Sequence, residues 1–287
     1  MWNPFNRNTI SNSSASKRSL QLITQKGMPF AYVEAYKALR TNLNFLSGSG
    51  DVHAFVVTST VPEEAKSNVS VNLALTLTES GKKVVLVDCD LRKPVLHRYL
   101  KAGHNLKGVS NVLSRQVALS DALVELKDIS NLTFLPAGTT PPNPSELLSQ
   151  PQMQEMVDTL RGSYDFVILD APPISMVTDA AVIGRIVDGA LFVVRSKYAS
   201  TDAVKTALEK LQDAGVKVLG AVLTRYDAKK SLKRSDYGYG YYYYNSNYSY
   251  GTPPDGILES AAEKSCLTSK NRHNGKEKHS VHTEDET

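Results

Sequence analysis

Lysine, serine and aspartate side chains in this sequence are placed where they could bind and transfer a phosphate group. Lys66 and Ser67 follow a run of β-branched and aromatic residues, Phe55 to Thr58, and a short loop, and apolar residues at helical spacing come after them. Backbone N–H groups at a helix N-terminus bind phosphate, a lysine ammonium adds positive charge, and a serine hydroxyl can ligate Mg²⁺. The stretch therefore predicts a strand, a phosphate-binding loop and a helix.

The loop departs from the standard pattern G-x-x-x-x-G-K-[ST], which would place glycine at positions 60 and 65. The chain has Thr60 and Ala65 there. The motif is therefore weak by itself, and the other elements of the chain decide whether it is a phosphate site.

Three aspartates lie at the ends of predicted buried strands. Asp88 and Asp90 end the apolar run that begins at Lys83, and Asp170 ends the run that begins at Tyr164. Ligands of open parallel sheets bind beyond the carboxyl ends of the strands, where carboxylates can hold Mg²⁺ or orient a proton. One aspartate alone could cap a turn or helix, but the pair at 88 and 90 favours metal or proton chemistry. An apolar strand ending in a single aspartate, as at 170, is common.

The remaining periodic segments alternate between strand and helix. We expect strands at 132–135, 190–194 and 216–223, helices at 35–46 and 203–211, short helical segments at 109–113 and 119–126, and a further helix capped by Ser145. This alternation predicts an α/β fold, a doubly wound and mostly parallel sheet with right-handed crossovers.

By composition, the 287 residues divide into four parts. The apolar periodicity predicts a folded domain at 29–228, between a polar segment at 1–28 and a polar tail at 252–287 that are both expected to be disordered. A basic linker and a flexible, tyrosine-rich tail occupy 229–251. Eight of the chain's 14 tyrosines lie in that tail: Tyr237, Tyr239, Tyr241, Tyr242, Tyr243, Tyr244, Tyr248 and Tyr250.

Composition also excludes several classes of protein. Two cysteines, Cys89 and Cys266, lack ligand spacing and argue against a zinc site or a disulfide scaffold and for a reducing compartment. The sequence has neither a run of 18 apolar residues nor the apolar core of a signal peptide, so we expect no transmembrane segment. The formal charge is +4. The basic cluster, formed by Lys229, Lys230, Lys233 and Arg234, has no groove-reading motif around it, so we expect no nucleic-acid partner.

Taken together, the motifs resemble the bacterial tyrosine kinases (BY-kinases) of capsular and exopolysaccharide biosynthesis, the CpsD/CapB-like family. The matching segments are EAYKALRTNL (34–43), VPEEAKS (61–67), VVLVDCDLRKP (84–94), PPNPSELL (141–148), DFVILDAPP (165–173), TDA (178–180) and the tyrosine cluster. Each segment is weak alone, but the set is specific. The resemblance implies a P-loop NTPase-like fold of the MinD/ParA type.

The resemblance also implies roles for individual residues. Lys66, Asp88 and Asp90 would be catalytic, with Asp90 or its neighbour drawing the proton from an incoming tyrosine. The nucleotide-binding loop would consist of Pro62, Glu63, Glu64, Ala65, Lys66, Ser67 and Asn68, and the Mg²⁺ ligands would be Ser67, Asp88 and Asp170. The oligomerisation residues would be Glu34, Lys37 and Arg40. The eight tyrosines of the tail would accept phosphate.

Cofactors and partners follow from the same resemblance. ATP and Mg²⁺ would be the cofactors. A membrane-embedded, CpsC-like polysaccharide co-polymerase would activate the kinase and recruit it from the cytoplasm to the inner face of the membrane. The unphosphorylated protein would form a homo-oligomeric ring, in which one subunit presents its tail to the next, and a cognate tyrosine phosphatase would reverse the modification.

The phosphate loop is where the sequence departs most from the family. The family usually has P-G-E-G-K-S-T, and this chain has Glu63, Ala65 and Asn68 at the three differing positions. A positive φ at 63 or 65 would cost about 1–2 kcal/mol each, and Glu63 near a triphosphate would add roughly 3 kcal/mol of repulsion. Together these would weaken ATP binding by about two to three orders of magnitude. Lys37 replaces an arginine of the assembly motif, and Thr224 stands where related ATPases often have asparagine.

Two other functions remain open. The altered loop could have lost catalysis, leaving a scaffold that regulates polysaccharide export by docking alone. The chain could also be a partitioning or division-site ATPase of the MinD/ParA type. That class has a signature lysine at the position of Val61, and it has no tyrosine tail.

Overall fold

The computed structural model describes residues 21–48, 52–126 and 128–226. The basic cluster, the tyrosine-rich tail, Cys266 and the polar tail all lie outside these residues. Among the helices described, none has the length and apolar character needed to cross a membrane.

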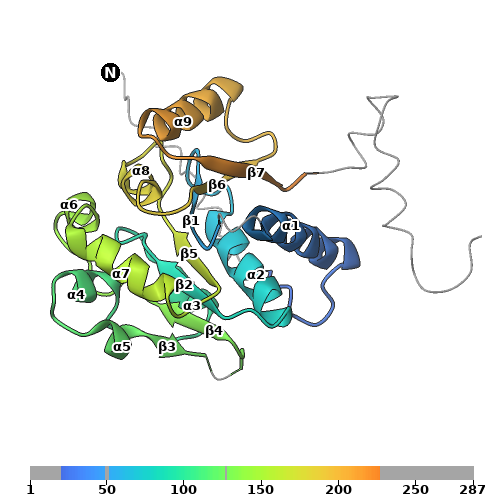
Figure 1. Ribbon diagram of the computed structural model, residues 1–287. Helices are drawn as coiled ribbons and strands as arrows, with labels where there is room; N and C mark the ends of the chain where they lie inside the picture. Colours follow the sequence, from blue (N-terminus) through green and yellow to red (C-terminus); the bar gives the residue numbers. More distant parts are fainter. Residues whose placement is uncertain (1–20, 49–51, 127, 227–287) are drawn as a thin grey trace, which may run out of the picture. The chain divides into compact units, whose positions relative to one another are not determined.

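Seven strands form one sheet in the order β3-β4-β2-β5-β1-β6-β7 (Figure 1). The strands are β1 (Ala54–Ser59), β2 (Val84–Asp88), β3 (Val124–Glu125), β4 (Leu132–Leu135), β5 (Phe166–Asp170), β6 (Ala190–Arg195) and β7 (Val218–Thr224). Only the β3–β4 pair is antiparallel among these pairings. The doubly wound, mostly parallel α/β fold predicted from the sequence is therefore confirmed.

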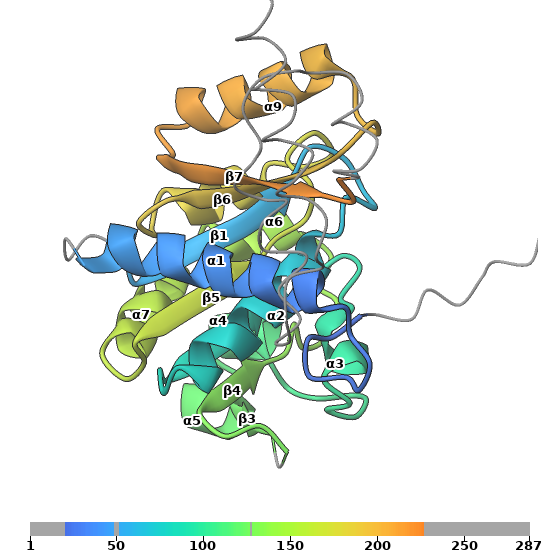
Figure 2. The ribbon, with the colours of Figure 1, turned by 90° about the vertical axis from the view of Figure 1, so that its right-hand side faces the viewer.

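Helices cover both faces of the sheet (Figures 1 and 2). One face carries α1 (Phe30–Gly48), α2 (Lys66–Glu79) and α3 (Leu96–Tyr99), and the other carries α4 (Val109–Leu113), α5 (Leu119–Ala122), α6 (Pro144–Leu148), α7 (Pro151–Arg161), α8 (Asp179–Gly184) and α9 (Thr201–Asp213). Figure 2 is turned so that α1 lies in front of the sheet.

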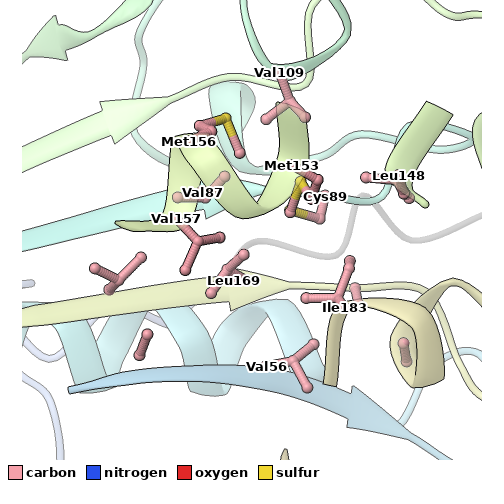
Figure 3. Close-up of a cluster of buried hydrophobic side chains, with 14 of the residues drawn as sticks. Val56, Val87, Cys89, Val109, Leu148, Met153, Met156, Val157, Leu169 and Ile183 are labelled. Carbon is pink, nitrogen blue, oxygen red and sulfur yellow. The ribbon is translucent and has the colours of Figure 1, made fainter. Parts of the chain in front are cut away.

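The core consists of one apolar cluster on each face of the sheet. Because successive strand residues point to opposite faces, Val56 and Leu169 join the cluster under α7, while Phe55 and Ile168 join the cluster under α2. Figure 3 shows the first cluster, with Met153 of α7 near the strand residues. Burial on both faces explains why the strands are continuous apolar runs rather than alternating ones.

Three local predictions are wrong. Residues 21–28 are not disordered, because Ile23 is buried and its N–H donates to Asn72 Oδ1 at 2.8 Å. The helix expected at 119–126 ends at Ala122, and Val124 and Glu125 instead pair with β4 as the edge strand β3. Ser145 is not a helix cap; it lies inside α6, where Asn143 is the N-cap residue.

Candidate active site

The phosphate loop, residues 60–65, joins the end of β1 to α2, which begins at Lys66. Two of its residues have left-handed backbone conformations, Glu63 with φ 71° and Ala65 with φ 72°. These are the two positions where the family usually has glycine. The backbone therefore keeps the glycine-type turn although both residues carry a Cβ, at a strain of about 1–2 kcal/mol each.

This strain predicts that Ala65→Gly stabilises the fold. Relief of about 1–2 kcal/mol is partly offset, because glycine makes the unfolded chain more flexible by about 0.4–1 kcal/mol. We expect the free energy of unfolding to rise by about 0.5–1 kcal/mol, measured by urea denaturation. Ala74→Gly, at a buried position inside α2, is the control and should destabilise. A loss of stability for Ala65→Gly would contradict the strain at this residue.

Glu64 connects the phosphate loop to the ends of β6 and β7 by hydrogen bonds. Its side chain is buried, with Oε2 accepting the N–H of Val61 at 2.9 Å and Oε1 accepting the N–H of Arg195 at 3.2 Å. The Thr224 hydroxyl donates to the carbonyl oxygen of Glu64 at 2.9 Å. Glu64 therefore turns into the loop, and Thr224, at the end of β7, binds the loop backbone.

The tips of β1, β2 and β5 bring five of the predicted residues together. Lys66 Nζ lies 3.2 Å from Asp90 Oδ2 and 3.2 Å from Asp170 Oδ2. The Ser67 hydroxyl donates to Asp170 Oδ2 at 2.6 Å. Asp88 is the register partner of Asp170 across the β2–β5 pair. A lysine, a serine hydroxyl and three carboxylates thus share one small region at the carboxyl edge of the sheet.

Burial and mutual charge change the protonation of this cluster. Burial and the nearby Asp170 charge raise the pKa of Asp88 to about 7. Burial lowers the pKa of Lys66, but the charges of Asp170, Asp90 and Asp88 outweigh it and leave that pKa raised. Lys66 is therefore a permanent cation at neutral pH, while Asp88 can gain or lose a proton there.

The same residues fit a magnesium ion. Ser67 and Asp170 offer hard oxygen atoms 2.6 Å apart, beside Asp88 on the neighbouring strand. Mg²⁺ prefers oxygen ligands and commonly takes only one or two carboxylates from the protein, keeping several waters. Within the described part of the chain there is no cluster of three or more His, Cys, Asp or Glu placed to hold a metal.

A second polar cluster was not assigned from the sequence. The buried carboxylate of Asp179 accepts from Arg92 Nε at 3.1 Å and from the Ser145 hydroxyl, and Arg92 Nη2 donates to Ser145 Oγ at 2.8 Å. Arg92 lies two residues after Asp90, whose Oδ1 accepts the N–H of Lys93 at 3.0 Å. The cluster therefore ties the loop that carries Asp90 to α6 and α8. The sequence did contain a signal for this cluster, because its three residues lie in the family-matching segments 84–94, 141–148 and 178–180.

Removal of Arg92 should destabilise the fold, because the cluster depends on its positive charge. Arg92→Ala leaves the buried Asp179 without its cation, although Arg92 is itself 37% exposed and part of the interaction is screened. We expect the free energy of unfolding to fall by about 1–2 kcal/mol at pH 7, measured by urea denaturation. Asp179→Asn in the same background should recover part of the loss. No recovery would show that Arg92 acts through another contact.

The predicted oligomerisation residues lie on α1, apart from this cluster. Glu34 and Lys37 form an ion pair at 2.7 Å within the helix, and Arg40 Nη1 donates to the carbonyl oxygen of Thr76 in α2 at 2.8 Å. Asn68 also faces α1, because its Oδ1 accepts from the hydroxyls of Tyr32 and Tyr36, each at 3.0 Å. The side chain of Asn68 thus joins the phosphate-loop helix to α1 instead of facing the carboxylates.

A phosphate loop after β1, with carboxylates at the tips of β2 and β5, defines a P-loop NTPase-like domain. The family described as "AAA domain" matches residues 64–218. Tyrosine-protein kinase YwqD of Bacillus subtilis (strain 168) is 37% identical over 205 residues, covering 71% of this chain and 84% of the relative. The chain belongs to the family of bacterial tyrosine-protein kinases.

Solved structures agree with this placement. The kinase domain of Escherichia coli tyrosine kinase ETK is 33% identical, with a TM-score of 0.65, and the match covers 73% of this chain and 80% of that domain. The septum site-determining protein MinD from Pyrococcus horikoshii OT3, solved with Mg-ADP, is 23% identical, with a TM-score of 0.54 and coverage of 65% and 79%. At that identity the MinD likeness shows the fold alone.

Proposed function

We propose that the chain is an ATP-dependent protein-tyrosine kinase that phosphorylates the tyrosines of its own C-terminal cluster, in trans between subunits. The observation that carries the proposal is the convergence of Lys66, Ser67 and Asp170 within hydrogen-bond and ion-pair distances at the strand tips, with Asp88 beside Asp170 on the neighbouring strand. Family membership supports the same activity.

In this mechanism the chain supplies position and charge. The loop N–H groups and the Lys66 ammonium hold the nucleotide phosphates and stabilise the charge that develops during transfer. Ser67 and Asp170 would hold Mg²⁺, which neutralises phosphate charge when bound. Asp90 or the neighbouring Asp88 would take the proton of the incoming tyrosine hydroxyl, and the pKa of Asp88, raised to about 7, suits a base near neutral pH.

The wider role in this proposal is the regulation of capsular or exopolysaccharide polymerisation and export. A CpsC-like membrane co-polymerase would recruit and activate the kinase, and a cognate phosphatase would reset it. Each phosphotyrosine adds about −1.5 to −2 charges, so modification of all eight would reverse the formal charge of +4. A heavily phosphorylated tail would then be repelled by the acidic site of a neighbour, and the ring would loosen.

Phosphopeptide mass spectrometry tests the activity directly. The purified full chain is incubated with a cytoplasmic fragment of the activator and MgATP, beside Lys66→Met. Phosphate on the tail tyrosines of the unaltered chain, and its absence from the variant, is the expected result. Mixing Lys66→Met with a catalytically intact chain that lacks the tail then tests transfer in trans, because only the variant can accept phosphate.

The left-handed Glu63 and Ala65 favour one alternative, a scaffold that has lost catalysis. Absence of tail phosphate in the unaltered chain and in Glu63→Gly/Ala65→Gly would support it. ATP hydrolysis stimulated by DNA or lipid, without phosphotyrosine, would instead support an ATPase of the MinD/ParA type.

A further inference from the structure

Glu63, the glutamate that replaces a family glycine, is accompanied by a cation on the same side of the phosphate loop. Its Oε2 accepts from the Tyr198 hydroxyl at 3.4 Å, and its carbonyl oxygen accepts from Arg195 Nη1 at 3.3 Å. The Arg195 guanidinium carbon lies 4.3 Å from the centre of the Tyr198 ring, within the range of a cation–π contact. Tyr198 therefore contacts both the acidic and the basic group.

Arg195 is fixed to the loop in two ways. Its backbone N–H, at the end of β6, donates to the buried carboxylate of Glu64, and its guanidinium donates to the carbonyl oxygen of Glu63. The cation is thus held against the rim of the loop by backbone, side chain and ring contacts. A surface arginine without such contacts would lose this position through side-chain motion.

Charge gives this arrangement a consequence for ligand binding. A nucleotide brings several negative charges to a loop that already carries the Glu63 carboxylate, and like charges disfavour each other at short range. The Arg195 cation, held at the carbonyl oxygen of Glu63 and at the ring that contacts the Glu63 carboxylate, reduces the repulsion felt by the phosphates. The contact with Tyr198 also fixes the direction of the carboxylate.

We propose that Arg195, positioned by Tyr198, compensates the charge of Glu63 and thereby keeps this loop able to bind the phosphates of a nucleoside di- or triphosphate. The inference rests on the nucleotide binding contained in the proposed function. If the inference holds, the effect of Arg195 on nucleotide affinity depends on the charge at residue 63. An arginine with a purely structural role would affect affinity regardless of that charge.

A double-mutant cycle separates these two roles. Affinity for MgADP is measured by isothermal titration calorimetry on the full chain, for Arg195→Gln, Glu63→Gln and the double variant. Glutamine at 63 removes the charge and leaves a side chain of nearly the same size. We expect Arg195→Gln to weaken binding by about tenfold or more, and the double variant to bind within about threefold of the unaltered chain. Arg195→Lys, which keeps the charge, should retain most of the affinity.

The controls address folding and net charge. Lys205→Gln, on the exposed side of α9, removes the same charge elsewhere and should change affinity less than about twofold. Unfolding midpoints are recorded for every variant. If Arg195→Gln does not fold, Tyr198→Ala, which removes both the hydroxyl and the ring, tests the arrangement, and about threefold weaker binding is then expected.

Two results would overturn the inference alone. One is that Arg195→Gln weakens binding equally in the unaltered chain and in the Glu63→Gln background, and the other is that Tyr198→Ala binds as the unaltered chain does. Failure of the unaltered chain to bind any nucleotide would overturn the proposed function as well. If the chain binds nucleotide but does not phosphorylate tyrosine, the double-mutant cycle can still be measured, because it depends on MgADP affinity alone.

Discussion

Asp88→Asn is expected to stabilise the protein at pH 8 while removing its phosphoryl transfer. Burial and the Asp170 charge raise the pKa of Asp88 from 3.8 to about 7. The folded state therefore holds this proton more tightly than the unfolded state, so stability falls as the pH rises from about 4 and the loss is complete above about 7. Three pKa units correspond to roughly 4 kcal/mol.

The expected gain for the asparagine variant is smaller than that figure. The Asp88 carboxylate accepts two backbone N–H groups, those of Asp90 and Leu96, each at 3.2 Å. An asparagine has one acceptor oxygen and loses one of these bonds, which offsets about 1–2 kcal/mol. We therefore expect the free energy of unfolding to rise by about 2 kcal/mol at pH 8, and by less at pH 5, where Asp88 is already protonated in the folded protein.

Urea denaturation at the two pH values measures this change, and Asp121→Asn, at an exposed position on α5, is the control for removing a carboxylate elsewhere. An equal gain at pH 5 and pH 8 would show that Asp88 does not titrate between them. Transfer to tyrosine should fall by about 10²–10⁴ if Asp88 takes the proton. The unaltered enzyme should then gain activity as the pH rises through about 7, and the variant should lack this rise.

Lys66→Met is expected to have the opposite effect on stability and an equally large effect on activity. The ammonium lies between the carboxylates of Asp90 and Asp170, each 3.2 Å away. Its removal leaves three carboxylates close together without a cation, which destabilises the fold by about 3–5 kcal/mol at pH 8. Transfer should fall by about 10²–10³, the usual effect of losing one charge-stabilising donor at a transition state.

The pH dependence distinguishes this explanation from simple loss of packing. As the pH falls through about 7, the pKa of Asp88, its protonation removes part of the repulsion, so the destabilisation of Lys66→Met should shrink between pH 8 and pH 5. Lys82→Met is the control, because Lys82 is 46% exposed and lies 4.0 Å from Asp165 at its nearest oxygen. Destabilisation that stays constant with pH would indicate a packing defect.

The sequence predicted the sheet well because burial on both faces leaves a simple pattern. Phe55 to Thr58 and Val84 to Val87 are fully buried runs, and each leads directly into residues of the site. The family's glycines left open whether residues 63 and 65 have a positive φ, and the structure shows that both do. The aspartates could be placed together because parallel strands bring their carboxyl ends to one edge.

Other features depend on contacts between distant segments, which periodicity does not encode. Arg92 and Asp179 are 87 residues apart in the chain, and their ion pair appears only when β2 and α8 are placed. The direction of the Glu64 carboxylate, into the loop, likewise depends on the end of β6. Residues 21–28 have few apolar side chains, so a single buried residue, Ile23, was too weak a signal for order.

The direction of β7 bears on how a tail tyrosine would reach the site if these tyrosines are the acceptors, as proposed. β7 is parallel to β6 and ends at Thr224, so the polypeptide leaves the sheet on the catalytic edge, three strand positions from β5, or about 14 Å. The 13 residues from there to Tyr237 span up to about 43 Å when extended. By length alone, this stretch of sequence would allow a tail tyrosine to reach the site of its own subunit. The proposed transfer between subunits would therefore depend on the geometry of an assembly, and a rate of phosphorylation that is independent of protein concentration would instead indicate the intramolecular route.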